Sequence, residues 1–278
     1  MNHLKSGFST NVGNVRSPNE DCFRTEPEIA LWLVADGMGG HKGGETASAI
    51  AADFIVDEIK AGKPLKKTIA QAHHELKQAS KDGKGPEGMG TTVVALQINA
   101  SCYEIAWVGD CRAYLWDGIT VKQLTKDHSY VQPLRDTGVI SRSESANHPY
   151  QDVLIQALGA ADIKDVNVET INHELYHNEQ ILICSDGLTK EVSDPGIADI
   201  LALELEEQKK VDLLIQTALK NGGRDNITAI LVSADDDAPV KKKEYDTIPL
   251  ISEKKIKTNI FEKLSAWLKR TLKAFFIN

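Results

Sequence analysis

Residues 31–40, LWLVADGMGG, join a buried-strand pattern to a sharp turn and place a carboxylate where the two meet. The five apolar residues before Asp36 are typical of a strand buried on both faces, and the glycines after it free the backbone to turn. Three other segments repeat this arrangement of an aspartate at a strand end: AWVGDCRAYLW (106–116) with Asp110, ILICSDGLT (181–189) with Asp186, and GGRDNITAILV (222–232) with Asp225. Because strand ends can meet at one rim of a core, the sequence predicts a cluster of four carboxylates.

Clustered carboxylates repel one another unless hard cations neutralise them, so the cluster predicts a metal site. Ligation by oxygen, with no His/Cys cluster near the four motifs, favours Mg²⁺ or Mn²⁺ over zinc. The Gly37 carbonyl can reach a cation beside the carboxylate of Asp36. Two metals about 3.5 to 4 Å apart can hold a bridging water and direct it as hydroxide at phosphorus.

Arg16 lies in the polar turn GNVRSPNEDCF (13–23) with Glu20 and Asp21, and its guanidinium can grip phosphate oxygens. Hydrolysis of a phosphomonoester is therefore expected.

Composition narrows the class of protein further. The 278 residues are enough for one large domain, or one domain with an appendage. The net charge is -8, but residues 238–278 hold ten Lys/Arg against four Asp/Glu, which leaves the preceding body near -14 and disfavours a nucleic-acid partner. The four cysteines show no CxxC spacing and are expected to be small buried hydrophobes in a reducing compartment. The N-terminus has no signal-peptide pattern and no apolar run reaches about 18 residues, so we expect a cytoplasmic protein.

The hydrophobic patterns predict strands and helices in blocks. Strands are expected at 3–10 and 29–36, helices from Glu45 and at about 64–81, and an antiparallel meander of four short strands in 91–125. Residues 126–150 form a polar excursion with a short helical piece. The remaining expected elements are strands at 152–158, 166–172, 180–184 and 226–233, and helices at about 194–204 and 209–220. This order favours an α+β layered domain over a doubly wound parallel sheet.

The C-terminal part of the chain has a different composition from the body. We expect the folded domain to span 1–235, a charged linker to cover 236–253, and residues 254–278 to form a basic amphipathic helix. Such a helix could lie on an anionic membrane surface, giving a peripheral location at the inner face of the membrane, or pack on the catalytic domain or on a partner protein. The sequence leaves both alternatives open.

Eight motifs occur in order between residues 5 and 234: RSPNED, VADGMGGHKGGETAS, GMGTT, WVGDCRAYLW, LTKDHS, NHP followed by ALG, SDGL and GGRDNIT. Together they resemble the metal-dependent serine/threonine protein phosphatases of the PPM (PP2C) class, bacterial branch. The resemblance implies a PP2C-like αββα sandwich, in which two antiparallel sheets are flanked by helices. It also implies a phosphatase for phosphoserine and phosphothreonine, expected to be a monomer, that opposes a bacterial Ser/Thr kinase.

The resemblance assigns roles to the acidic residues. It implies that Asp36 bridges two Mn²⁺ or Mg²⁺ ions, that the Gly37 carbonyl binds one of them, and that Asp186 and Asp225 complete the other. Asp110 would join Asp186 in holding a third, more weakly bound metal. Glu20 and Asp21 would act through bound water, Arg16 would hold the phosphate, and residues 133–150 would form a flap beside the catalytic cleft.

Several positions depart from the family pattern or leave alternatives open. Met38 stands where eukaryotic relatives have a histidine able to act as general acid. Ile155 and Gln156 stand where bacterial relatives usually have Thr-Arg. His128 and His148 match positions expected to hold loops by hydrogen bonds. Two other functions compete with protein dephosphorylation: a catalytically silent phosphate-sensing module, and a phosphohydrolase for small molecules.

Overall fold

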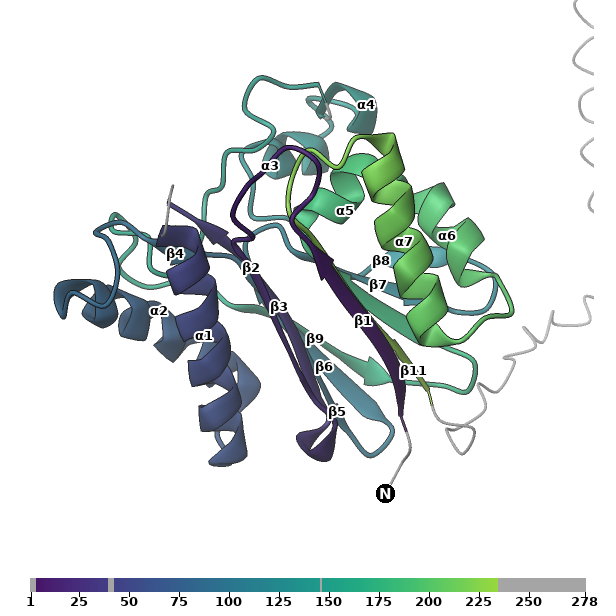
Figure 1. The fold of residues 1–278 in the computed structure, drawn as a ribbon, viewed down its shortest axis with the longest axis horizontal. Helices are drawn as coiled ribbons and strands as arrows, with labels where there is room; N and C mark the ends of the chain where they lie inside the picture. The colour runs from purple at the N-terminus through teal and green to yellow at the C-terminus, as the bar shows by residue number, and fades with distance from the viewer. Residues whose placement is uncertain (1–3, 40–42, 146, 235–278) are drawn as a thin grey trace, which may run out of the picture. The chain divides into compact units, whose positions relative to one another are not determined.

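Two antiparallel sheets pack face to face, and helices cover the outer face of each (Figure 1). The computed structural model describes residues 4–39, 43–145 and 147–234. The expected linker 236–253, the expected helix 254–278 and the loop residue His41 lie outside the described residues. The predicted αββα sandwich is confirmed for the described part of the chain.

The strands divide between the two sheets in an order that differs from their order in the sequence. The first sheet has the order β1 (Lys5–Asn11), β11 (Ile227–Ser233), β10 (Gln180–Cys184), β7 (Arg112–Trp116) and β8 (Val121–Gln123). The second has the order β2 (Asp21–Glu26), β3 (Leu31–Met38), β5 (Val93–Asn99), β6 (Cys102–Val108) and β9 (Glu169–Glu174), with β4 (Gly90–Thr91) paired to β3. A short 3₁₀ turn, η1 (Pro27–Ile29), joins β2 to β3.

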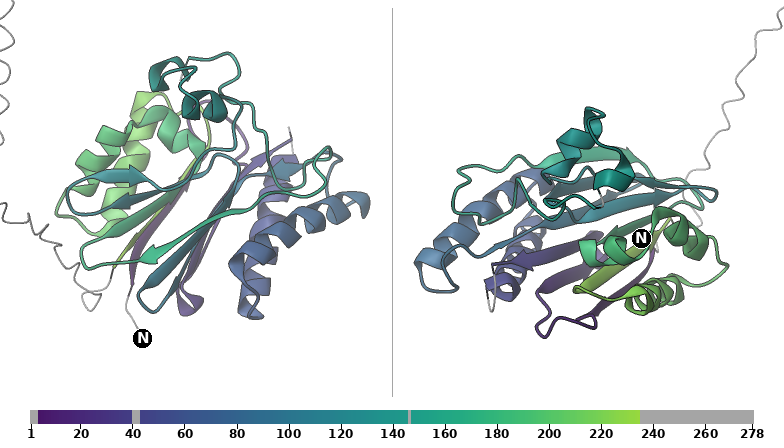
Figure 2. Two further views of the ribbon diagram at one scale, coloured as in Figure 1. Left: turned by 180° about the vertical axis from the view of Figure 1, so that it is seen from behind. Right: turned by 90° about the horizontal axis from the view of Figure 1, so that it is seen from above.

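The helices form two outer layers. The second sheet is covered by α1 (Gly43–Lys60) and α2 (Leu65–Lys81), and the first by α5 (Asp186–Glu191), α6 (Asp194–Leu201) and α7 (Glu207–Asn221). The short helices α3 (Val131–Asp136) and α4 (Arg142–Ser145) lie at one end of the sandwich, as Figure 2 also shows. Within the described residues, no helix is long and apolar enough to span a membrane.

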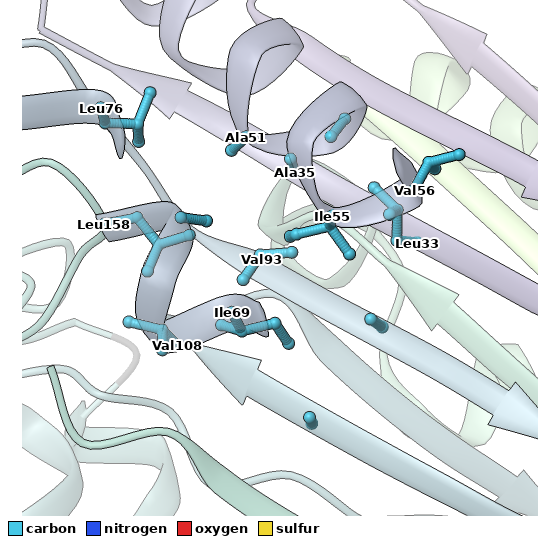
Figure 3. Packing of buried hydrophobic residues seen from close by; sticks show 14 of the residues in the cluster. Leu33, Ala35, Ala51, Ile55, Val56, Ile69, Leu76, Val93, Val108 and Leu158 are labelled. Atoms are coloured by element: carbon cyan, nitrogen blue, oxygen red, sulfur yellow. The ribbon is translucent and has the colours of Figure 1, made fainter. Parts of the chain in front are cut away.

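The strand β3 shows why continuous apolar runs form this fold. Alternate side chains of a strand point to opposite faces, and both faces of this sheet are covered. Leu31, Leu33 and Ala35 therefore pack against the helices, in the core shown in Figure 3, whereas Trp32 and Val34 pack between the sheets. The strands β10 and β11 divide their side chains in the same way between the intersheet core and the helices of the other layer.

Strands β1 and β11 bring together residues from the two ends of the described chain. They are antiparallel, with Lys5 opposite Ser233 at one end and Asn11 opposite Ile227 at the other. The second end leads directly into Asp225. The termini of the described domain and its acidic strand ends therefore lie at opposite ends of the first sheet.

Three sequence predictions about the strands were wrong. The four strands expected as one meander are two hairpins in different sheets, because the chain crosses from one sheet to the other between β6 and β7. At this crossing Gly109 has φ +105°, and a Cβ there would lie 2.4 Å from the Cβ of Thr92, so the turn needs glycine. Residues 152–158 are irregular, with isolated bridges at Leu154 and Leu158 in place of a strand. Residues 21–23 of the predicted turn belong to the strand β2.

The cysteines are free thiols, but only two of them fit the prediction of small buried hydrophobes. Cys111 and Cys184 are buried, Cys22 is half-buried, and Cys102 is exposed at the start of β6. The prediction was therefore wrong for Cys102, which is exposed at a strand end.

Candidate metal centre

Asp21 and Asp36 lie directly opposite each other on the neighbouring strands β2 and β3. Asp36 has the same parity along β3 as Trp32 and Val34, so it faces the space between the sheets. The Oδ2 atom of Asp21 accepts hydrogen bonds from Ser185 Oγ at 2.8 Å and from Thr228 Oγ1 at 2.7 Å. Thr228 lies on β11 of the other sheet and Ser185 directly follows β10, so Asp21 ties the two sheets together at this end.

Asp186 and Asp225 reach the same end from the other sheet. Asp186 is the first residue of α5, just after β10, and Asp225 directly precedes β11. A Cβ at Gly187 would lie 1.9 Å from the carbonyl oxygen of Asn226, so a glycine is needed where α5 passes this strand. The close approach holds Asp186 beside Asp225.

Asn226 fixes the polar turn that carries Glu20. Its Oδ1 accepts the N–H of Glu20 at 2.8 Å, and its Nδ2 donates to the carbonyls of Val12 and Pro18, both at 3.0 Å. The carbonyl of Glu20 in turn accepts the N–H of Gly37 at 3.1 Å. The turn predicted to gather polar residues is thus bound to both sheets.

Asp110 lies in the crossing turn between β6 and β7, and His128 holds this turn. The N–H of Gly109 donates to His128 Nδ1 at 3.1 Å, and the N–H of His128 donates to the Gly109 carbonyl at 2.9 Å. His148 similarly accepts the N–H of Tyr150 at 3.1 Å through Nδ1. Both histidines hold loops by hydrogen bonds, as the sequence predicted.

The acidic cluster carries more negative charge than its surroundings neutralise. Burial raises the pKa of the Asp36 carboxyl well above its ordinary value, and the nearby charges of Asp21, Asp186, Asp110 and Asp225 raise this pKa further. Burial likewise raises the pKa of Asp110 well above its ordinary value, with Asp186 as the next cause. For Asp21, burial raises the pKa to about 7, although the hydrogen bonds from Thr228 and Ser185 act in the opposite direction. Cations placed here would relieve this repulsion.

The residues present fit a metal centre whose donors are oxygen atoms. Among the described residues, three buried carboxylate oxygens have no hydrogen-bond partner: Glu20 Oε1, Asp21 Oδ1 and Asp186 Oδ1. Orphaned charged oxygens of this kind are costly unless a cation binds them. Within the described residues, no group of three or more His, Cys, Asp or Glu side chains is by itself spaced to hold a metal ion. The expected donor set adds the Gly37 carbonyl and water to the carboxylates.

Two basic side chains contact the cluster at its solvent-facing edge. Arg16 forms a bidentate pair with Asp225, with Nε 3.0 Å from Oδ1 and Nη2 3.1 Å from Oδ2. The Arg16 side chain is 53% exposed, so it can exchange this partner for a ligand from solvent. The ammonium of Lys190 lies 2.5 Å from Asp186 Oδ2, 3.3 Å from Asp152 Oδ1 and 3.6 Å from Asp225 Oδ2.

A cleft of about 960 Å³ adjoins the cluster and is lined by Asp110, Asp186 and Asp225 together with Arg16. Residues Arg135, Arg142, Ser145 and Asn147 of the predicted flap form part of its wall. The flap is tied to the first turn of α6 by an ion pair between Arg142 and Asp194. Deeper in the cleft, Arg112 and Asp127 form a bidentate pair with Nη2 2.6 Å from Oδ2.

The positions that depart from the family pattern lie as follows. Met38 is 39% exposed at the end of β3, and its thioether has no proton to donate. Ile155 is exposed on the irregular segment. The Oε1 of Gln156 accepts the N–H of Asn167 at 2.7 Å, so this side chain is engaged with a loop.

Sequence reasoning found every carboxylate of the cluster except Asp152, and it missed the residues that hold them. Ser185 and Thr228 gave no signal, because buried hydroxyls are common and their partner Asp21 is distant in sequence. Lys190 did give one: it follows Asp186 by four residues, which places the two side chains together on a helix. The signal was missed because α5 was not predicted.

Comparison with known proteins agrees with the geometry. A family model described as protein phosphatase 2C matches residues 14–231. The chain belongs to this family. A serine/threonine phosphatase from Listeria monocytogenes is 37% identical over 245 residues, which cover 84% of this chain and 96% of that protein. A serine/threonine protein phosphatase from Mycobacterium tuberculosis is 32% identical over 239 residues, 84% of this chain and 45% of that protein.

Solved structures give the same result. A crystal structure of the Mycobacterium tuberculosis serine/threonine phosphatase matches with a TM-score of 0.76 and 31% identity, covering 84% of this chain and 99% of that chain. The catalytic domain of a serine/threonine protein phosphatase in complex with two manganese ions matches with a TM-score of 0.73 and 29% identity, covering 84% and 99%. This member of the 2C family is a metal-dependent protein-serine/threonine phosphatase of the bacterial type.

Proposed function

We propose that this phosphatase hydrolyses phosphoserine and phosphothreonine in proteins at the acidic end of the sandwich. Asp36, the Gly37 carbonyl, Asp186 and Asp225 would hold two Mn²⁺ or Mg²⁺ ions there. When bound, such ions would act as Lewis acids and lower the pKa of a water, so that it could attack phosphorus as hydroxide near neutral pH. The observation that supports this most is the gathering of acidic side chains at this end, where burial raises the pKa values of Asp21, Asp36 and Asp110. Among the described residues, Glu20, Asp21 and Asp186 each have one buried oxygen without a hydrogen-bond partner.

Arg16 would orient the phosphate of the substrate. Its guanidinium already holds a carboxylate in the bidentate manner that suits a phosphate, and half of the side chain faces solvent at the mouth of the cleft. Two parallel hydrogen bonds would fix the phosphorus relative to the carboxylates and offset the charge that develops on the phosphoryl oxygens.

The proton for the leaving alkoxide cannot come from residue 38. A methionine there has no acidic hydrogen, so the serine or threonine oxygen must be protonated from another source, such as solvent in the cleft. The more detailed roles of the remaining acids also belong to this proposal. Glu20 and Asp21 would act through water, and Asp110 with Asp186 would hold a third, weaker ion.

The simplest test is Mn²⁺-dependent hydrolysis of p-nitrophenyl phosphate. Asp36→Asn and Asp186→Asn should each lower kcat by at least about 1000-fold, because each removes a charge from the centre. Asp57→Asn, on an exposed position of α1, changes the same chemical group away from the cleft and should leave kcat unchanged. Full activity in both cluster variants would overturn the assigned centre.

A second measurement separates protein dephosphorylation from the competing functions. We expect phosphoserine and phosphothreonine peptides to give a higher kcat/KM than nucleotides or sugar phosphates. A preference for the small molecules would favour the metabolite phosphohydrolase. Phosphate binding without turnover of any substrate would favour the silent sensing module.

The cellular partners follow from the same proposal. The substrates would be phosphoproteins made by a cognate Ser/Thr kinase in the cytoplasm, with the phosphatase acting as a monomer. Phosphoproteomics on a deletion strain should show phosphoserine and phosphothreonine sites that accumulate. An unchanged set of sites would contradict the role.

The basic segment 254–278 would add a contact with an anionic membrane or with a protein surface, through a linker at 236–253. A vesicle sedimentation assay tests the membrane alternative by comparing the full chain with a chain that ends at Asp237. Sedimentation of the full chain alone, lost at high salt, would support membrane contact. Equal and negligible sedimentation of both would leave protein contact as the remaining alternative.

A further inference from the structure

Lys190 is held against the edge of the acidic cluster by the helix that Asp186 begins. The two residues are four apart on α5, so their side chains lie on one face, and the ammonium approaches Asp186 Oδ2 to 2.5 Å. The same ammonium lies 3.6 Å from Asp225 Oδ2. Its positive charge therefore lies next to Asp186 and Asp225, two of the carboxylates expected to bind metal.

A third carboxylate comes from a segment that was expected to be a strand. Because residues 152–158 are irregular, Asp152 reaches the edge of the cluster, with Oδ1 3.3 Å from the ammonium of Lys190. Lys190 thus lies within 4 Å of three acidic side chains, whose negative charges its ammonium offsets.

The two oxygens of Asp186 have different surroundings. Its Oδ1 is buried and has no hydrogen-bond partner in the described part of the chain, whereas its Oδ2 is paired with Lys190. A cation in the core of the site can use Oδ1 without disturbing the lysine. A further cation that needs Oδ2 must compete with an ammonium tethered by its own helix, and two positive charges cannot share that oxygen without strong repulsion.

We propose that Lys190 acts as a built-in counter-ion at Asp186 Oδ2, so that a third ion held by Asp110 and Asp186 must displace it. The phosphatase would then hold two divalent ions tightly and a third only by displacing the lysine. This inference rests on the metal centre of the proposed function and adds a residue that sets its stoichiometry. The Lys190 side chain is 36% exposed, so it can swing into solvent when the third ion binds at high concentration.

The test is a measurement of metal binding, with equilibrium dialysis against Mn²⁺ and elemental analysis of the bound ions. Wild-type protein should bind two ions tightly and a third weakly. Lys190→Gln should tighten the third ion at least tenfold, whereas Lys190→Arg, which keeps the charge, should leave it weak. Lys209→Gln removes a lysine from an exposed ion pair with Glu206 on α7 and serves as the matched control. Thermal unfolding of each variant shows that the fold is kept.

Two outcomes would overturn the inference. One leaves the proposed metal centre standing, and the other refutes the metal centre as well. If wild type binds two tight ions and Lys190→Gln leaves the affinity for the third unchanged, the role of Lys190 is refuted and the metal centre stands. If wild type binds no tight Mn²⁺ at all, both the metal centre and the role of Lys190 are refuted.

Discussion

The metal-free domain should lose stability as the pH rises, and Asp21 allows this loss to be measured. The folded carboxyl has a pKa of about 7, raised from 3.8 mainly by burial. Between these two pH values the folded state keeps a proton that the unfolded chain has released, so the free energy of unfolding falls as the pH rises. The contribution is fully present below about pH 4 and lost above about pH 7.

The expected size follows from the difference between the two pKa values. About three pKa units at 1.36 kcal/mol each give a loss of up to about 4 kcal/mol across this pH range. Asp21→Asn should abolish it, because an amide oxygen can still accept the hydrogen bonds from Ser185 and Thr228 while the side chain stays neutral. The variant should then be more stable than wild type at pH 8 and close to it at pH 4.

The assay is urea unfolding, followed by tryptophan fluorescence, between pH 4 and 8.5 with EDTA present. The difference between wild type and Asp21→Asn reports this carboxyl together with its effect on Asp36, whose pKa the charge of Asp21 raises further. Added Mn²⁺ should restore stability to wild type at high pH, since the ion binds the ionised carboxylates of the folded state. A difference that stays constant with pH, or that changes in the opposite direction, would refute the reasoning.

Two further predictions concern single side chains at the centre. Arg16→Ala should lower kcat/KM by about 100-fold and cost no more than about 1 kcal/mol of stability, because the ion pair it loses is largely exposed. Arg24→Ala, which removes a comparable surface pair with an aspartate far from the cleft, should leave kcat/KM unchanged, and equal losses in both variants would contradict a phosphate-binding role. Gly187→Ala should destabilise the domain by more than about 2 kcal/mol in urea unfolding, since its Cβ would lie 1.9 Å from the carbonyl oxygen of Asn226. Gly196→Ala, whose nearest neighbour would be the Val192 side chain at 3.2 Å, should cost clearly less, and a similar cost would be evidence against steric exclusion at α5.

The sequence predicted the acidic end of the fold because both of its signals are local. An apolar run reports a strand buried on both faces, as in β3 and β10, and an aspartate with glycine at its end reports a turn. The structure brings Asp36, Asp110, Asp186 and Asp225 to one end of the sandwich for this reason. Which strand pairs with which is a different question. The predicted meander was wrong because a strand has the same hydrophobic pattern in either sheet. The chain passes from one sheet to the other at Gly109, and this crossing determines which strands pair.

The missed elements have weak local signals. The strand β2 is partly exposed along its whole length and carries Arg24 and Glu26, so it lacks the alternation of a half-buried strand. Its pairing with β3 is what makes it a strand. The helix α5 has six residues, too few for a helical hydrophobic period to be visible. Conversely, residues 152–158 contain enough apolar residues for a strand, but Val153 and Ile155 are exposed and the segment forms a loop beside the cleft.

The pairing of Lys5 with Ser233 has a practical consequence for engineering. Both ends of the described domain lie side by side, a full seven-residue strand away from the acidic end, which is about 20 Å. A tag or a fused domain attached at residue 4 or 234 would therefore begin on the side away from the cleft. The same proximity suits circular permutation: a short glycine-serine linker could join the two ends, and new termini could be opened in an exposed turn such as residues 117–120.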